Sequence, residues 1–214
     1  GHPPILMIRK TLYPIVCLLT VAFFIACKGS GQPADTVAAN PEDLKQKERQ
    51  LIEYYLQKAV ADSGRTEDSL VRLYAPELLQ SFYASDSHNA FWSAGEKWLP
   101  EADSLYRYIQ DGRLMGLYPN DYHFPELKMI RERLIADSLG KGDRKDAHWW
   151  SAADLLLSDA LVRMIKDVKL GRLPQDSISL RKDSVLSDSF YLARLKTVKE
   201  QGVSAMIKTL EPVV

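Results

Sequence analysis

The apolar residues of this chain recur three or four positions apart along most of its length, which is the spacing of amphipathic helices. The first such stretch follows Asn40-Pro41, where Asn is a good helix cap and Pro suits the first helical position, and it ends at Asp62-Ser63-Gly64. The longest runs from about Ala147 to Leu170, and Gly171 is expected to end it in a left-handed conformation. Further helices are predicted over Pro76–Tyr83, from Pro100 through Ile109 to an end near Gly112 or Gly116, and over Pro125–Leu139, Phe190–Glu200 and Val203–Leu210.

Stretches that alternate apolar and polar residues, as half-buried strands do, are almost absent. We therefore expect an all-α protein with an irregular multi-helix domain. The segment from Leu117 to Tyr122 is predicted to be a turn, because Pro119 and Asn120 favour backbone bends.

The N-terminal segment has the pattern of an export signal. Gly1 to Leu6 are treated as an upstream remnant and left out of the fold. A short basic head is followed by an apolar run from Ile15 to Ala26, shorter than the roughly 20 residues that span a bilayer. Cys27 closes the run and resembles the lipid-attachment cysteine of a bacterial lipobox, although Phe24 stands where leucine is usual. An ordinary cleaved signal or an uncleaved anchor are the alternatives.

Composition narrows the function classes. The 28 basic and 28 acidic side chains cancel, so a nucleic-acid partner is not expected. Both cysteines, Cys17 and Cys27, lie in the leader, so the body offers no cysteine nucleophile, disulfide or thiolate metal site. No cofactor is implied, because Gly29-Ser30-Gly31 lacks the strand–loop–helix setting of a phosphate-binding loop.

Three motifs occur in order along the body. The first is the Trp92–Trp98 segment followed by Asp111–His123, with a "dGL-P-dY" pattern, the second is the helix Ala153–Leu161, and the third is the turn Lys169–Pro174. Together they resemble the helical scaffold domain of large murein L,D-transpeptidases, the YcbB-like group. The resemblance covers roughly Leu70 to Pro212.

This resemblance implies a scaffold that precedes a peptidoglycan-binding module and a catalytic domain. In that family the catalytic cysteine lies in a Ser-x-Gly-Cys-x-Arg motif, attacks a stem-peptide carbonyl and forms an acyl-enzyme. The present chain has no such motif. It is therefore expected to be a fragment without catalytic residues of its own, with the missing modules of the parent chain as its partners.

Residues that match the family motifs are expected to be structural; they are Trp98, Gly116, Leu117, Tyr122, Asp154, Gly171 and Arg172. Asp154 and Asp159 lie about 140° apart around their helix, which argues against shared chemistry. Asp154 is expected to cap or salt-bridge a neighbouring element, with Arg172 or Arg163 as candidate partners. Trp150 is the candidate for a surface contact with glycan or a partner domain, whereas Trp98 and Trp149 are expected to pack in the core.

Two other chemistries have partial support in the sequence. Ser179 and Lys182 fit the Ser-x-x-Lys pattern of penicillin-binding proteins, but the companion motifs are absent and the segment is polar. The histidines lack metal-ligand spacing, and His123 is expected to bond a local carbonyl rather than to pair with Asp121. A serine acyl-transferase is thus the weakest interpretation.

The sequence predicts three parts: a leader and signal over residues 1–27, a flexible tether over 28–39, and a helical scaffold over 40–214. The leading hypothesis is the scaffold region of an L,D-transpeptidase in the cell envelope, lipid-anchored at Cys27 and facing the periplasm, with indirect access to peptidoglycan. The alternative is a stand-alone lipoprotein that binds peptidoglycan or a wall synthase.

Overall fold

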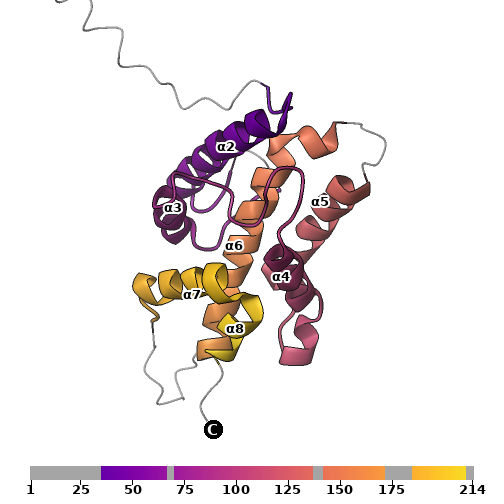
Figure 1. Ribbon diagram of the computed structural model, residues 1–214. Coiled ribbons are helices and arrows are strands. Elements are labelled where there is room, and N and C mark those ends of the chain that lie inside the picture. The colour runs from indigo at the N-terminus through magenta and orange to yellow at the C-terminus, as the bar shows by residue number, and fades with distance from the viewer. Residues whose placement is uncertain (1–34, 67–69, 137–141, 172–184, 211–214) are drawn as a thin grey trace, which may run out of the picture. The chain divides into compact units, whose positions relative to one another are not determined.

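The computed structural model describes residues 35–66, 70–136, 142–171 and 185–210, all within the unit Gln32–Val214. These residues form α-helices and short 3₁₀ helices, and the only pairing of extended backbone among them is three isolated bridges, so the protein is all-α as predicted (Figure 1). The α-helices are α2 (Pro41–Ala61), α3 (Pro76–Ala84), α4 (Pro100–Gln110), α5 (Phe124–Ala136), α6 (Ala147–Leu170), α7 (Asp188–Gln201) and α8 (Val203–Lys208). The 3₁₀ helices are η1 (Gly112–Met115), η2 (Pro119–Tyr122) and η3 (Asp143–Lys145).

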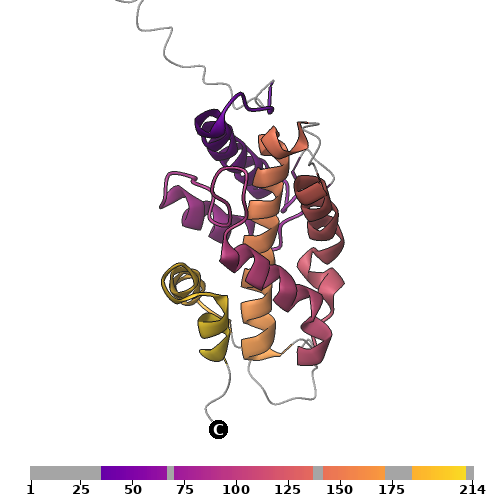
Figure 2. The same ribbon diagram turned by 45° about the vertical axis from the view of Figure 1, so that its right-hand side comes forward.

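Helix α6 is the centre of the fold. Figure 1 shows α2 and α3 on one side of it and α4 and α5 on the other, and all four helices contact it. In the turned view α4 crosses in front of α6 (Figure 2). Three consecutive residues, Leu155, Leu156 and Leu157, have no exposed surface. Successive helical residues point in directions about 100° apart, so α6 is covered on all sides in this stretch.

Helix α2 begins where the sequence predicts. The Asn40 side chain accepts hydrogen bonds from the backbone N–H groups of Glu42 and Asp43, and Pro41 occupies the first turn. Leu51, Ile52 and other residues of its inner face are buried against α6 and α3. The local cap and the apolar stripe thus agree, which is why the N-terminal boundary could be predicted.

The predicted turn between α4 and α5 is more regular than expected, because Pro119–Tyr122 winds into the 3₁₀ helix η2. Gly116 adopts the left-handed conformation that closes η1, with φ 72° and ψ 14°. Gly171 ends α6 with a positive φ of 86°, as predicted, but its ψ of 158° is extended and not that of a left-handed helical residue. Either backbone conformation favours glycine, which has no Cβ.

Candidate functional site

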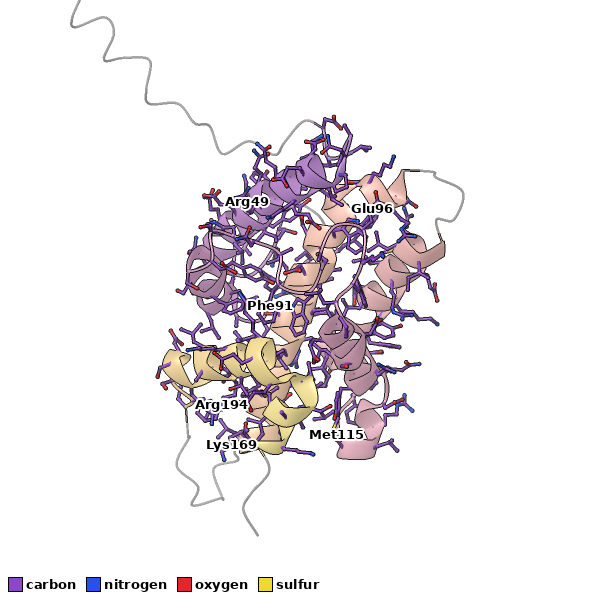
Figure 3. All side chains as sticks on the ribbon, viewed as in Figure 1. Arg49, Phe91, Glu96, Met115, Lys169 and Arg194 are labelled. Carbon is purple, nitrogen blue, oxygen red and sulfur yellow. The ribbon has the colours of Figure 1, made fainter. Side chains whose placement is uncertain are left out.

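A buried carboxylate on α6 holds the loop between α3 and α4. Asp154 is 1% exposed, and it accepts hydrogen bonds from the backbone N–H of Phe91 at 2.9 Å and of Trp92 at 2.8 Å. The Tyr83 hydroxyl of α3 donates to the same carboxylate at 2.6 Å. Figure 3 shows Phe91 beside α6. Asp154 therefore binds a neighbouring segment through neutral donors.

The arginine partners suggested for Asp154 play no such part among the described residues. Arg163 lies 4.0 Å from Asp167 instead, one turn further along the same helix. Arg172, the other suggested partner, is outside the described residues. Backbone N–H groups can replace a cation here because a carboxylate that accepts several hydrogen bonds is stabilised in its charged form.

A hydroxyl next to Asp154 extends this network. Ser158 Oγ lies 2.7 Å from the Tyr83 hydroxyl, and it accepts from the indole N–H of Trp92 at 2.8 Å. Burial raises the pKa of Asp154 to about 6, while its hydrogen bonds from Tyr83, Phe91 and Trp92 act in the opposite direction. Burial and the nearby Asp154 charge raise the pKa of Tyr83. The network joins α3, α6 and the loop at Phe91 in one arrangement.

Asp159 performs a similar task for different segments. It is fully buried and accepts from the backbone N–H groups of Tyr74 and Ala75, at 2.8 and 2.9 Å, where the chain enters α3. Its other contact is with His123 Nε2, at 2.7 Å, which lies between η2 and α5. The prediction that His123 bonds a local carbonyl is therefore wrong, because the fold brings a distant carboxylate to the turn. Asp154 and Asp159 hold separate segments, in keeping with their angular separation.

Glu48 on α2 is a buried acid that sequence reasoning missed. It is 2% exposed, and Ser93 Oγ donates to its Oε1 at a long distance of 3.4 Å. Burial first, and the Asp154 charge second, raise the pKa of Glu48 to about 8. The signal was present, since Glu48 lies one turn from Leu44 and from Ile52 in the apolar stripe of α2.

Other residues of the family motifs lie on or beside the α4–α5 connection and at the end of α6. Tyr122 is buried, and its hydroxyl donates to Asp167 Oδ2 at 2.8 Å. Leu117, which belongs to the same connection between α4 and α5, is also buried. Trp98 is half-buried against the core and pairs by a backbone bridge with Ser93. Gly171 is exposed at the end of α6.

The hypothesis that Trp150 contacts a partner at the surface is wrong. Trp150 is 3% exposed, and its indole N–H donates to the Arg144 carbonyl at 2.8 Å. Trp149 packs against the core as expected, but it is only half-buried, with the Arg133 guanidinium 4.5 Å from its ring centre. Because neighbouring segments cover α6 on several sides, both Trp149 and Trp150 can be at least partly buried although they are adjacent in sequence.

Several other candidates can be placed briefly. His148 Nδ1 lies 2.6 Å from the Tyr55 hydroxyl. No group of three His, Cys, Asp or Glu side chains suited to a metal occurs in the part of the chain that the structure describes. Within the same residues, no helix has the length and apolar character needed to cross a membrane. Cys27, Ser179 and Lys182 lie outside the described residues.

These contacts define an all-α domain in which the carboxylates of a central helix hold the backbone of the connecting loops. A family model described as a scaffold domain matches residues 77–214. The match covers more than half of the chain, and the protein therefore belongs to the scaffold-domain family. No curated protein and no solved structure matches it.

Proposed function

We propose that this chain is the helical scaffold part of a cell-wall L,D-transpeptidase. Its role is geometric: it holds a cysteine-dependent catalytic domain in position for peptidoglycan crosslinking. The supporting observation is the family match over residues 77–214, which contains the dGL-P-dY segment, the Asp154 helix and the Gly171-Arg172 turn in the order of that enzyme group.

The carboxylate contacts of α6 suit a part whose work is to keep a fixed shape. Asp154 and Asp159 join loops that lie 62 to 85 residues away in sequence, at Trp92 and Tyr74, to one central helix. Buried and fully bonded polar networks favour a single arrangement over alternatives. A stiff support of this kind transmits the position of one end of a protein to the other.

In this proposal the scaffold, residues 40–214, stands outside the inner membrane in the periplasm. The tether predicted over 28–39 is too long, because the Ala38 N–H donates to the Lys145 carbonyl at 2.7 Å and the Thr36 carbonyl accepts from the Ala147 N–H at 2.9 Å. In this proposal residues 28–34 serve as the tether, and Cys27 carries the lipid that anchors the protein to a membrane of the cell envelope. Each buried CH₂ of an acyl chain contributes about 0.8 kcal/mol of membrane affinity, so a multiply acylated cysteine anchors firmly.

The reading frame beyond the Val214 codon tests the transpeptidase assignment. We expect it to continue into a domain with a Ser-x-Gly-Cys-x-Arg motif, and purified residues 28–214 alone to form no crosslinks between muropeptides. A stop codon directly after Val214 would instead favour the stand-alone lipoprotein. Crosslinking by the isolated residues would contradict the scaffold role.

Metabolic labelling with an alkyne fatty acid tests the anchor. The wild-type protein should take up the label and sediment with membranes, because acylation requires the thiol of Cys27. Cys27→Ser should remain unlabelled. Cys17→Ser is the matched control, since it removes the other cysteine of the leader and should keep the label. Label retained in Cys27→Ser would show that the anchor lies elsewhere.

A further inference from the structure

A cavity of about 260 Å³ opens between the loop before α4, the helices α4 and α5, and η3. Five charged side chains line it, three of them basic and two acidic: Lys97, Arg131, Arg144, Glu96 and Asp103. Figure 3 shows Glu96 near the N-terminal end of α6 and the neighbouring α5. The family assignment and the scaffold role leave this cavity unexplained.

Arg131 is fixed in the cavity wall with donors to spare. Its Nη2 donates to Asp103 Oδ1 at 2.9 Å, and its guanidinium lies 4.9 Å from the ring centre of Tyr106 and 5.7 Å from that of Trp98. A guanidinium has five N–H donors in a rigid fork, and this ion pair uses one of them. The Arg131 side chain is 35% exposed and lines the cavity, while its Nε is buried and has no hydrogen-bond partner among the described residues.

Arg144 is held at another part of the wall. Its Nη2 donates to the Glu96 carbonyl at 2.8 Å, and its own carbonyl accepts from the buried indole N–H of Trp150. The loop that carries Glu96 and Trp98 is itself bonded to Asp154 through Trp92. Two guanidinium groups are thus presented to one cavity by segments with defined positions, an arrangement suited to a planar carboxylate.

The acidic side chains restrict the class of ligand that the cavity can bind. Glu96 and Asp103 reduce the formal charge of the lining to a single positive unit. They repel a polyphosphate, and they can accept hydrogen bonds from an ammonium group. The apolar part of the wall, from Trp98, Leu134, Ile135 and the otherwise buried Trp150, suits small alkyl groups such as methyls.

We propose that this cavity binds a small zwitterionic amino acid or peptide. The carboxylate of the ligand lies against Arg131 and Arg144, and its ammonium group lies against Glu96 and Asp103. The cavity volume is below the roughly 300–1,000 Å³ typical of sites for drug-sized ligands, so a dipeptide is the appropriate size. Such binding goes beyond the scaffold role, which requires no ligand.

Titration with D-alanyl-D-alanine, followed by proton–nitrogen correlation spectra of the tryptophan indoles, tests the proposal. The indole signal of Trp98 should shift, because its ring lines the cavity, whereas that of Trp92 in the Asp154 network should not. The N-acetylated and C-terminally amidated dipeptides should each bind about tenfold more weakly, since each loses a charged hydrogen-bonding group.

Arg131→Gln should weaken binding of the dipeptide by about tenfold or more. Arg133→Gln is the matched control, because Arg133 lies on the same helix but packs on Trp149 outside the cavity lining, and its affinity should be unchanged. If Arg131→Gln does not fold, the affinities of the two modified dipeptides for the wild-type protein still test the proposal. An unmoved Trp98 signal, equal binding of the amidated dipeptide, or unchanged affinity in folded Arg131→Gln would overturn the proposal. None of these results depends on the reading frame beyond Val214.

Discussion

Replacing Asp154 with alanine should lower the free energy of unfolding by about 3–5 kcal/mol. The carboxylate accepts from Tyr83 and from the backbone of Phe91 and Trp92, and its removal leaves these buried donors without an acceptor. Each hydrogen bond to a charged group contributes about 1.5–3 kcal/mol, and the cost of burying the carboxylate offsets part of the sum. Urea denaturation followed by far-ultraviolet circular dichroism measures the change.

Asp86→Ala is the matched control for Asp154→Ala. Asp86 lies in the loop between α3 and α4, as Phe91 and Trp92 do, but its side chain is 56% exposed. Its Oδ2 forms a surface ion pair with Lys199 Nζ at 3.2 Å. Exposed ion pairs contribute about 0–1 kcal/mol, so this change should be nearly silent. Asp154→Asn keeps the volume and one acceptor oxygen but should still lower the free energy of unfolding, because its NH₂ group replaces the second oxygen and faces a backbone N–H donor. Unfolding free energies equal to wild type in both Asp154 variants would refute the role assigned to this residue.

Raising the pH from about 6 to about 8 should lower the free energy of unfolding by roughly 2 kcal/mol through Glu48 alone. The folded pKa of about 8 lies above the ordinary value of 4.5, so the folded state holds this proton more tightly than the unfolded state. The stabilising contribution is complete below pH 4.5 and is lost as the pH rises through about 8. Asp154, with a pKa of about 6, contributes in the same direction over a lower and narrower range.

Glu48→Gln should remove most of this pH dependence, since the amide has no proton to lose and fits the same space. At about pH 8 the variant should be at least as stable as wild type, because it buries no charge. Glu53→Gln is the matched control on an exposed face of α2 and should keep the wild-type slope. Titration of groups that do not interact with Glu48 cancels in the comparison with wild type, and the coupling between Glu48 and Asp154 is part of the difference measured for Glu48→Gln. An unchanged slope in Glu48→Gln would contradict the burial argument.

Most helix boundaries were predictable because their causes are local. Asn40 caps α2 with its own side chain, and Pro41, Pro76 and Pro100 each begin a helix within a residue of the expected place. The apolar period of Ala147–Leu170 predicted the longest helix at both ends. Such signals depend on residues one to four positions apart, which a sequence displays directly.

The roles of the polar residues on these helices were not predictable in the same way. Asp154 and Asp159 were expected to be structural, but their partners were not identified, because the donors lie on loops far away in the chain. Trp150 was assigned to the surface and is buried, since the number of neighbours around α6 cannot be read from one helix. Glu48 was passed over although its place in an apolar stripe was visible.

The all-α class, the places where helices begin and the order of the family motifs follow from the amino-acid order alone, because each depends on nearby residues and on helical periodicity. The identity of the buried carboxylates, the backbone N–H groups that they hold and the arginines that share a cavity become clear only in the folded chain. Those properties arise from the close approach of segments tens of residues apart. Burial of an acid changes its pKa, and occupation of its oxygens by loop donors makes it a support for the fold.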